Sequence, residues 1–313
     1  MPRAILPDEE FVATLNRIKS PTAFAKLTGQ SYRSVLGRMG RLEEKGHRFE
    51  VSDKRSFRHV PDTNPGRLNK QIGNGVVMVG SDAHYFPGNV TRAHKAFVKL
   101  IRELKPSVVV MNGDVFDGAT ISRWPRIGWD KKPTVKQELD TCKDRLQEIT
   151  DAAPRAAYIW PLGNHDARFE TFLAAHASEY EGIKGFHLKD NFPEWKPCWS
   201  FFVNDNTVIK HRFKGGIHAT HNNTLWAGRS IITGHLHSLK STPLSDYAGT
   251  RYGVDSGTLA DPYGEQFNDY TEDNPVNWRS GFVVLTYRNG FLLPPELCEV
   301  TPLGPVFRGQ VIS

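Results

Sequence analysis

The sequence predicts an α/β protein in which two packed, mixed β-sheets are flanked by helices and preceded by a small all-α domain. Three observations lead to this fold class. Residues 1–49 carry only helical periodicity, residues 76–160 alternate strand, helix and strand, and the later part contains two hairpin patterns. With 313 residues, the chain has room for one large domain and one small one.

Capping signals divide the N-terminal segment into three short helices. Ser20 followed by Pro21 supplies an N-cap and a proline at the first helical position, and Gly29 breaks the chain before Ser31 caps the next helix. The expected helices are about 8–19, 21–27 and 31–45. A short helix, a glycine turn and a longer basic helix with an apolar stripe at Val35, Met39 and Leu42 predict a helix-turn-helix.

Residues 25–31, with Val35, Arg38, Leu42 and Gly46 after them, resemble the helix-turn-helix of bacterial transcription regulators. The resemblance implies that residues 31–45 form the recognition helix in the major groove of DNA. The nucleic-acid contacts expected in this segment are Ser31, Tyr32, Arg33, Ser34 and Arg38. The alternative is a three-helix packing module without DNA affinity.

The charge distribution favours a nucleic-acid surface near the N-terminus. Residues 1–74 hold 14 Lys/Arg and 8 Asp/Glu, so the formal net charge of +6 lies entirely in this quarter of the chain. An ordinary solvated basic face is the alternative. Residues 50–74 are polar and contain prolines and glycines, which predicts a linker. The expected organisation is therefore a domain at 1–49, a linker at 50–74 and a catalytic domain at 75–313.

Cellular location is predicted from what the sequence lacks. It contains no apolar run of membrane-spanning length, and its start has no secretory layout. Cys142, Cys198 and Cys298 are widely spaced, so neither a disulfide framework nor a thiolate zinc site is expected. We therefore expect a cytoplasmic protein that does not bind membranes and whose partner is DNA; no pattern points to a protein partner.

The second domain alternates strands with helices before it changes to hairpins. The expected strands are 76–80, 108–111 and 157–160, and the expected helices between them are 91–104 and 135–152. Two hairpins are expected later, with strands at 201–203 and 207–210, and at 282–287 and 291–293.

Metal-binding side chains follow these strands in six short stretches. They are Asp82-Ala83-His84, Gly113-Asp114-Val115-Phe116-Asp117, Gly163-Asn164-His165-Asp166, His211, Gly234-His235-Leu236-His237 and Asp255-Ser256-Gly257-Thr258. An α/β sheet collects its ligand-binding groups at such strand ends. Residues two apart lie on one side of an extended chain, so Asp82 and His84 are expected to reach one ion together. The same alternation is expected to direct the imidazoles of His235 and His237 into the site from one strand end.

Carboxylate, imidazole and amide ligands suit two divalent ions, with manganese expected and iron, zinc or nickel as alternatives. Two ions about 3.5–4 Å apart can activate water and clamp a phosphate ester. The ordered series of motifs between residues 76 and 260 resembles the calcineurin-like metallophosphoesterase superfamily, whose fold is an α/β/β/α sandwich. The resemblance implies one ion held by Asp82, His84 and His237, a second held by Asn164, His211 and His235, and a bridge formed by Asp114. It also implies that His165 donates a proton to the leaving oxygen and that Asp117 holds its imidazole.

Two assignments stay open in this motif series. Asp166 could orient an imidazole or stabilise a turn. For the isolated histidine, we prefer His211 to His218 and His221, because a predicted strand delivers His211 while the other two fall at a helix start.

The substrate prediction is a nucleic acid. Gly118 and Leu162 replace two arginines of the phosphoprotein phosphatase branch, which disfavours that branch. After Asp117, basic residues alternate with Trp124 and Trp129, which predicts stacking on bases; tryptophans that anchor the loop in the core are the alternative. The contacts expected there are Arg123, Trp124 and Arg126. The acidic, aromatic stretch 261–278 is expected to shape or cover the site.

These observations together predict a dinuclear-metal phosphodiesterase or nuclease that acts on DNA and is recruited by the helix-turn-helix. The alternatives are a small-nucleotide phosphatase or phosphodiesterase, and a DNA-binding regulator that uses a phosphoesterase domain as a scaffold.

Overall fold

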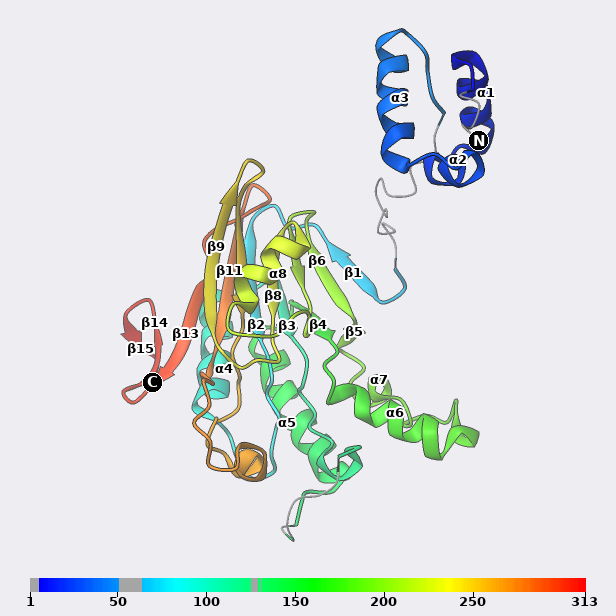
Figure 1. The fold of residues 1–313 in the computed structure, drawn as a ribbon. Helices are drawn as coiled ribbons and strands as arrows, with labels where there is room; N and C mark the ends of the chain where they lie inside the picture. Colours follow the sequence, from blue (N-terminus) through cyan, green and yellow to red (C-terminus); the bar gives the residue numbers. More distant parts are fainter. Residues whose placement is uncertain (1–5, 51–63, 125–128, 130) are drawn as a thin grey trace. The chain divides into compact units, whose positions relative to one another are not determined.

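A computed structural model describes residues 6–50, 64–124, 129 and 131–313. It divides into two compact units, one up to Asn64 and one from Pro65 onward, and each is described here by itself (Figure 1). In the described residues, no helix combines the length and apolar character needed to cross a bilayer.

The first unit is three helices around a small core. They are α1 (Asp8–Ile18), α2 (Pro21–Thr28) and α3 (Tyr32–Glu44). The predicted caps form, because Ser20 accepts a hydrogen bond from the backbone N–H of Ala23 and Ser31 accepts one from Ser34. The predicted stripe is buried, and the core consists of Phe11, Leu15, Phe24, Ala25, Val35, Met39 and Leu42.

The expected linker contains a strand at residues 67–70, so these four residues are not a linker. Strand β1 (Arg67–Lys70) pairs in parallel with β6 (Ser200–Val203), and Ile72 is buried in the core. The backbone N–H of Ile72 donates to Asn204 Oδ1. Both partners lie about 130 residues away, so local composition carries no signal for this pairing. Residues 51–63 of the expected linker lie outside the described residues.

The second unit contains two mixed sheets, as predicted. The nine-stranded sheet has the order β15-β14-β13-β11-β2-β3-β4-β5, with β12 paired to β11. Its strands are β2 (Gly75–Gly80), β3 (Val108–Met111), β4 (Ala157–Pro161), β5 (Lys196–Cys198), β11 (Gly281–Arg288), β12 (Phe291–Leu292), β13 (Glu296–Thr301), β14 (Gly304–Phe307) and β15 (Gln310–Val311). Strands β2 to β5 run parallel to one another, and those from β11 to β15 are antiparallel.

The six-stranded sheet has the order β1-β6-β7-β8-β10-β9. Besides β1 and β6, it contains β7 (Thr207–Ile209), β8 (Ser230–Thr233), β9 (Lys240–Asp246) and β10 (Gly249–Asp255). The predicted hairpin between β6 and β7 is confirmed, with Phe201 opposite Ile209.

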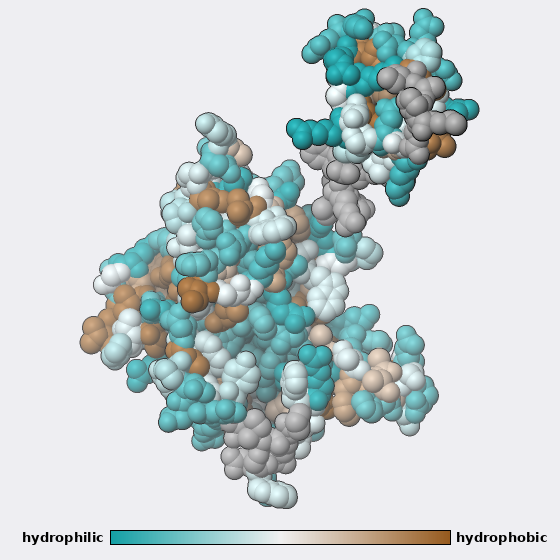
Figure 2. Space-filling model, viewed as in Figure 1, coloured by the Kyte–Doolittle hydropathy of each residue, from teal (hydrophilic) through white to brown (hydrophobic). Residues whose placement is uncertain are grey.

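Alternation along β2 builds the layers. Val77 and Val79 face the six-stranded sheet in one core, whereas Met78 packs into a second core with Phe97 and Ile101 of α4 (Arg92–Leu104). Helix α5 (Val135–Ala152) packs beside α4, and α8 (Ala219–Ala227) covers β8, β9 and β10 (Figure 1). Helices α6 (Asp166–His176), α7 (Leu188–Asn191) and α9 (Asn268–Thr271) complete this unit. On the face in Figure 2, apolar side chains form separate patches among polar ones.

Candidate metal centre

Strand ends of both sheets supply the predicted ligands. Asp82, Asp114 and Asn164 follow β2, β3 and β4 of the nine-stranded sheet. From the six-stranded sheet, His211 follows β7, and His235 and His237 follow β8. Because the two sheets pack face to face, these ends meet at one edge of the sandwich.

The backbone is left-handed, and not extended, at five of the seven predicted metal ligands. The side chains are therefore not directed by the strand-like alternation that the sequence predicts. The φ angles are 50° at Asp82, 38° at His84, 51° at Asp114, 74° at His235 and 55° at His237. Each such conformation costs on the order of 1–3 kcal/mol, and such conformations cluster at functional sites. The loops turn sharply because they touch one another, and the turn, not strand alternation, aims the side chains.

Three glycines permit this close approach. A Cβ on Gly113 would collide with the His211 ring, one on Gly163 with Asp114, and one on Gly234 with Ser81 and Asp82. Each of these three motifs therefore needs a glycine at its first position, because any side chain there would displace a predicted ligand.

Six of the seven predicted ligands, all except Asn164, lie in two adjacent groups. Asp82, His84 and His237 form one, in which His237 Nε2 is 3.0 Å from Asp82 Oδ1. Asp114, His211 and His235 form the other, in which His211 Nε2 is 3.1 Å from Asp114 Oδ2. His211 Nε2 is also 3.9 Å from Asp82 Oδ1, so the two groups adjoin.

Unsatisfied buried atoms show that this donor set fits metal ions. His84 Nε2 and Asn164 Oδ1 are buried and have no hydrogen-bond partner among the described residues. Leaving a buried polar atom unpaired costs about 1–3 kcal/mol, so such atoms require an explanation. Both belong to residues predicted to bind metal, one to each ion, and a divalent cation would satisfy them.

In the second group, the negative charge of Asp114 and the positive charge of His211 stabilise each other. Burial raises the pKa of Asp114, but His211 beside it outweighs burial and holds that pKa well below its usual value. Burial likewise lowers the pKa of His211, yet Asp114 and then Asp82 raise it to about 10. His211 Nδ1 donates to the carbonyl of Asn112 at 2.7 Å, which turns Nε2 toward the carboxylates. A cation would replace the proton on Nε2, so metal binding is expected to release a proton.

Asp117 orients two imidazoles. Its Oδ1 accepts from His165 Nδ1 at 2.7 Å, as predicted, and also from His84 Nδ1 at 2.9 Å. The second contact, which the sequence reasoning missed, leaves His84 Nε2 to face the ligand group. Beyond His165, Arg168 donates from Nη2 to His165 Nε2 at 3.0 Å and from Nη1 to the carbonyl of Asp117. Arg168 was also missed; its position one helical turn after His165 was the available signal.

Asp166 stabilises turns, which answers the question that the sequence left open. Its carboxylate is fully buried and accepts five hydrogen bonds. The donors are the backbone N–H groups of Asp114, Val115, Phe116 and Gly163, and the indole N–H of Trp160. A single carboxylate therefore holds the loop after β3 against the loop after β4, and with it the position of Asp114.

Two further buried carboxylates support the loops. Glu138 of α5 accepts from the backbone N–H groups of Gly118 and Ala119, and burial together with the charge of Asp117 raises the pKa of Glu138 to about 7. The sequence reasoning missed Glu138, although its spacing of four from Cys142 places it on the buried stripe of the helix. Asp255 accepts from Ser238 and Gly257, so the last of the six stretches supports the loop after β8 and lies outside both ligand groups.

The nucleic-acid contacts expected in the helical unit differ in their exposure to solvent. Tyr32, Arg33 and Ser34 are exposed at the start of α3, and Ser31 is exposed beside them as its cap. The side chain of Arg38 is instead bound inside the helical unit, where it pairs with Asp8 at 2.6 Å and lies over the Phe11 ring, so a DNA contact is not supported for it.

The tryptophans after Asp117 are on the surface. Trp124 is 67% exposed and Trp129 is 98% exposed, so the core-anchor alternative is wrong. Arg123 lies over the Trp124 ring at 5.1 Å. Arg126 lies outside the described residues. His218 and His221 are exposed at the start of α8 and belong to neither ligand group, which agrees with the choice of His211.

The stretch 261–278 covers one side of the centre, as expected. The Phe267 ring lies 5.3 Å from that of His84, and the Trp278 ring lies 4.5 Å from that of His237. Tyr270, which is exposed, stacks on Trp278. Aromatic rings therefore exclude water beside the first ligand group.

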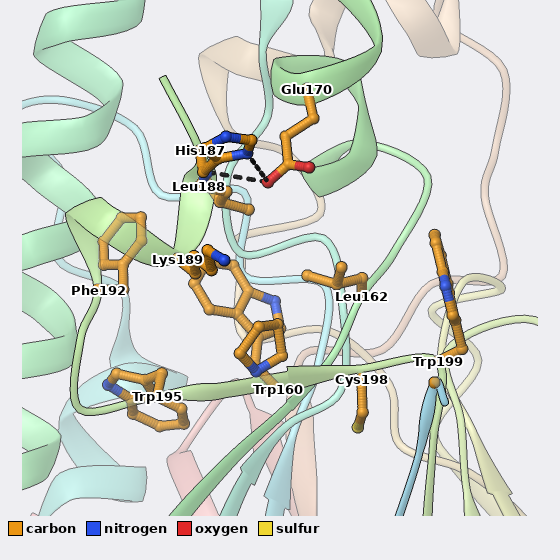
Figure 3. Close-up of a pocket in the computed structure, with 12 residues that line it drawn as sticks. Trp160, Leu162, Glu170, His187, Leu188, Lys189, Phe192, Trp195, Cys198 and Trp199 are labelled. Carbon is orange, nitrogen blue, oxygen red and sulfur yellow. Dashed lines mark hydrogen bonds and ion pairs between the residues drawn. The ribbon is translucent and has the colours of Figure 1, made fainter. Parts of the chain in front are cut away.

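A separate pocket of about 240 Å³ lies between β4, β5 and α7 (Figure 3). Trp160, Phe192 and Trp195 line it, and Glu170 points toward His187 at its rim (Figure 3). Its lining includes none of the predicted ligands, so this pocket is distinct from the metal centre.

Comparison with known proteins agrees with this geometry. Residues 75–255 match the family model for calcineurin-like phosphoesterases. The chain is 26% identical over 252 residues to the Gene 54 protein of Mycobacterium phage L5, a match that covers 72% of this chain and 93% of the relative. The Gene 54 protein of Mycobacterium phage D29 matches over 251 residues with the same identity and coverage.

Similar solved structures are more distant. Vps29 of Entamoeba histolytica, complexed with zinc, has a TM-score of 0.38 and 13% identity, and the match covers 74% of this chain and 96% of that one. Yfce, a phosphoesterase from E. coli, has a TM-score of 0.30 and 12% identity, with 70% and 97% covered. At TM-scores this low, neither likeness adds to the family assignment.

Proposed function

This chain belongs to the calcineurin-like phosphoesterase family, and from that premise we propose that it is a dinuclear-metal phosphodiesterase that cleaves DNA. The observation that carries the proposal is the pair of adjoining ligand groups, together with the buried His84 Nε2 and Asn164 Oδ1, which have no hydrogen-bond partner in the described part of the chain. Metal-dependent hydrolysis of a phosphate ester is the activity of the family. The diester bond, the nucleic acid and the recruitment by the helical unit are our proposal.

In this proposal, Asp82, His84 and His237 would hold one ion, and Asn164, His211 and His235 the other, with Asp114 between them. A pair of divalent ions supplies a strong nucleophile from water near neutral pH and stabilises the charge that develops on the phosphate. Oxygen and imidazole donors without thiolates suit manganese, which we propose as the native metal. We also propose that the protein works in the cytoplasm.

His165 would donate the proton that the leaving oxygen needs. Asp117 holds its ring by Nδ1, so Nε2 is the atom that transfers the proton. Arg168 now donates to this Nε2. Because a guanidinium cannot accept a hydrogen bond, Arg168 has to leave Nε2 before that atom can carry a proton. An incoming phosphate is a strong competitor for the guanidinium, so substrate binding would free Nε2 to take up a proton from water and then pass it to the leaving oxygen.

Replacing His165 with alanine is expected to keep both metals and to slow hydrolysis of substrates with poor leaving groups by about a hundredfold or more. Substrates whose leaving group is p-nitrophenolate need little protonation and should be less affected. Turnover of a methyl ester and of a p-nitrophenyl ester of the same phosphate measures the difference. Equal losses on both esters would show that His165 is not the proton donor.

Support for DNA comes from the exposed Arg123 and Trp124 beside the loop that carries Asp117, and from the start of α3. Arg33 lies in the first turn of α3, where no acidic residue is present. A cation there opposes the helix dipole, an unfavourable placement that binding to a phosphate would offset. A small-nucleotide substrate is the second candidate, because the exposed Tyr270 stacked on Trp278 offers one base a platform beside the centre.

Manganese-loaded protein should hydrolyse bis(p-nitrophenyl) phosphate and also degrade DNA. If the protein hydrolyses the small diester but leaves both single- and double-stranded DNA intact, the nuclease proposal is rejected. A small-nucleotide substrate is then favoured.

The proposed recruitment to DNA by the helical unit is tested separately. Arg33→Glu in the full chain is expected to weaken binding to duplex DNA and to flatten its salt dependence. Arg17→Glu makes the same charge change on the exposed face of α1 and is the matched control. Equal effects of the two variants would identify a general basic surface.

A further inference from the structure

One stretch of the catalytic unit carries cations without any acidic residue. Residues 206–245 contain no Asp or Glu, although the chain has 34 of them in 313 residues. The same stretch holds five Lys/Arg, namely Lys210, Arg212, Lys214, Arg229 and Lys240. The net charge of the catalytic unit is close to zero, but this stretch has five positive side chains and no negative one.

This positive segment borders the candidate metal centre. Its loop, residues 212–218, begins directly after His211, and every residue in it is exposed. A Cβ placed on Gly215 would lie 3.9 Å from the side chain of Leu236, which stands between His235 and His237. His235 is the exposed member of the predicted ligands. The loop therefore lies against the side on which the centre is open.

Exposed aromatic rings alternate with these cations. Phe213 is 43% exposed and Trp226, near the end of α8, is 68% exposed. The Lys210 ammonium lies 5.3 Å from the centre of the Phe213 ring, and that of Lys214 lies 3.4 Å from the centre of the Trp226 ring. We call Lys210, Arg212, Phe213, Lys214 and Trp226 the Lys214 surface.

Hydrogen bonds from two other elements hold the loop in place. Asn223 of α8 is 1% exposed, and it accepts from the backbone N–H of Lys214 and donates to the carbonyl of the same residue. Lys240 donates to the carbonyl of Ile217 at 2.8 Å. A loop that is anchored at two points while its apolar side chains stay in water is organised for a ligand.

Rings and cations in alternation fit one class of ligand. Unpaired bases stack on aromatic faces while neighbouring cations follow the phosphates; a duplex has its bases paired and offers only phosphates to this arrangement. We infer that the Lys214 surface binds single-stranded nucleic acid and leads it into the metal centre. The inference rests on the proposed function and deepens it, because it specifies an unpaired strand as the substrate.

The test measures binding without cleavage. Metal-free full-length protein is titrated into a fluorescein-labelled 20-nucleotide single strand and into the matching duplex, and anisotropy reports the affinity. Trp226→Ala is expected to weaken single-strand binding about tenfold and to leave duplex binding unchanged. Lys214→Gln should reduce the slope of log affinity against log salt by about 0.7 for the single strand. Tyr247→Ala removes a fully exposed ring from the turn between β9 and β10 and should bind like the wild type.

Three outcomes would overturn the inference. They are wild-type affinity in both variants, equal losses on single strand and duplex, and a change in self-association, measured by sedimentation, in place of a change in oligonucleotide affinity. Hydrolysis of bis(p-nitrophenyl) phosphate by the manganese-loaded wild type is measured in parallel. If that hydrolysis is present while the variants bind normally, this inference alone fails; if it is absent, the proposed function fails whatever the variants bind.

Discussion

Asp166→Ala is expected to destabilise the catalytic unit by at least about 5 kcal/mol. Five N–H groups would lose their only shared acceptor, and an unsatisfied buried donor costs about 1–3 kcal/mol. Domains are stable by about 5–15 kcal/mol, so the variant should unfold far more readily and in part fail to fold. Urea unfolding followed by circular dichroism measures the difference.

Two comparisons make the Asp166 result specific. Asp166→Asn keeps one acceptor oxygen, so its loss should be intermediate. Asp261→Ala removes an exposed carboxylate that accepts one backbone hydrogen bond, from Tyr263, and should change stability by less than about 1 kcal/mol. If Asp166→Ala unfolds at nearly the urea concentration of the wild type, the five hydrogen bonds do not hold the two loops together.

Local signals were sufficient for helices α1 to α5 and for strands β2, β3, β4, β6, β7, β11 and β12, whereas the other strands of the two sheets were not predicted. Ser20 and Ser31 cap the helices that their positions predict, and β2, β3 and β4 lie where apolar runs of strand length occur. Capping and apolar periodicity act between near neighbours, so one sequence contains them. Strand β1 was missed because its partner β6 is remote in sequence, and a short polar segment carries no periodicity of its own.

The site was predictable by residue type and less so by geometry. The predicted ligands come together because strand ends of two sheets meet, which the strand pattern implies. Their left-handed backbone was not predictable, because it arises from the close contact of loops that are far apart in sequence. For the same reason the sequence did not reveal that Asp117 holds a second imidazole or that Asp166 accepts five hydrogen bonds. Such roles depend on long-range contacts, and one sequence shows none of them.

Asp114→Ala is expected to lower turnover of bis(p-nitrophenyl) phosphate by about a thousandfold or more. Asp114 belongs to the second ligand group, where it contacts His211, and in our proposal it bridges both ions, so its loss would remove a ligand from each ion and several kcal/mol of charge stabilisation. Elemental analysis under saturating manganese should find two ions per wild-type chain and at most one per variant chain. His237→Ala should lose one ion, because it removes one ligand of the first group.

Controls separate loss of charge from loss of shape in the Asp114 experiment. Asp114→Asn keeps the size of the side chain and removes the negative charge, so it should lose turnover almost as severely. His221→Ala removes an exposed imidazole outside both groups and should keep two ions and normal turnover.

The charge of Asp114 also raises the pKa of His211, so the pKa of His211 should be lower in the metal-free Asp114→Asn protein, which NMR can follow. An Asp114→Ala chain that kept two ions and full turnover would exclude a bridging role for this carboxylate.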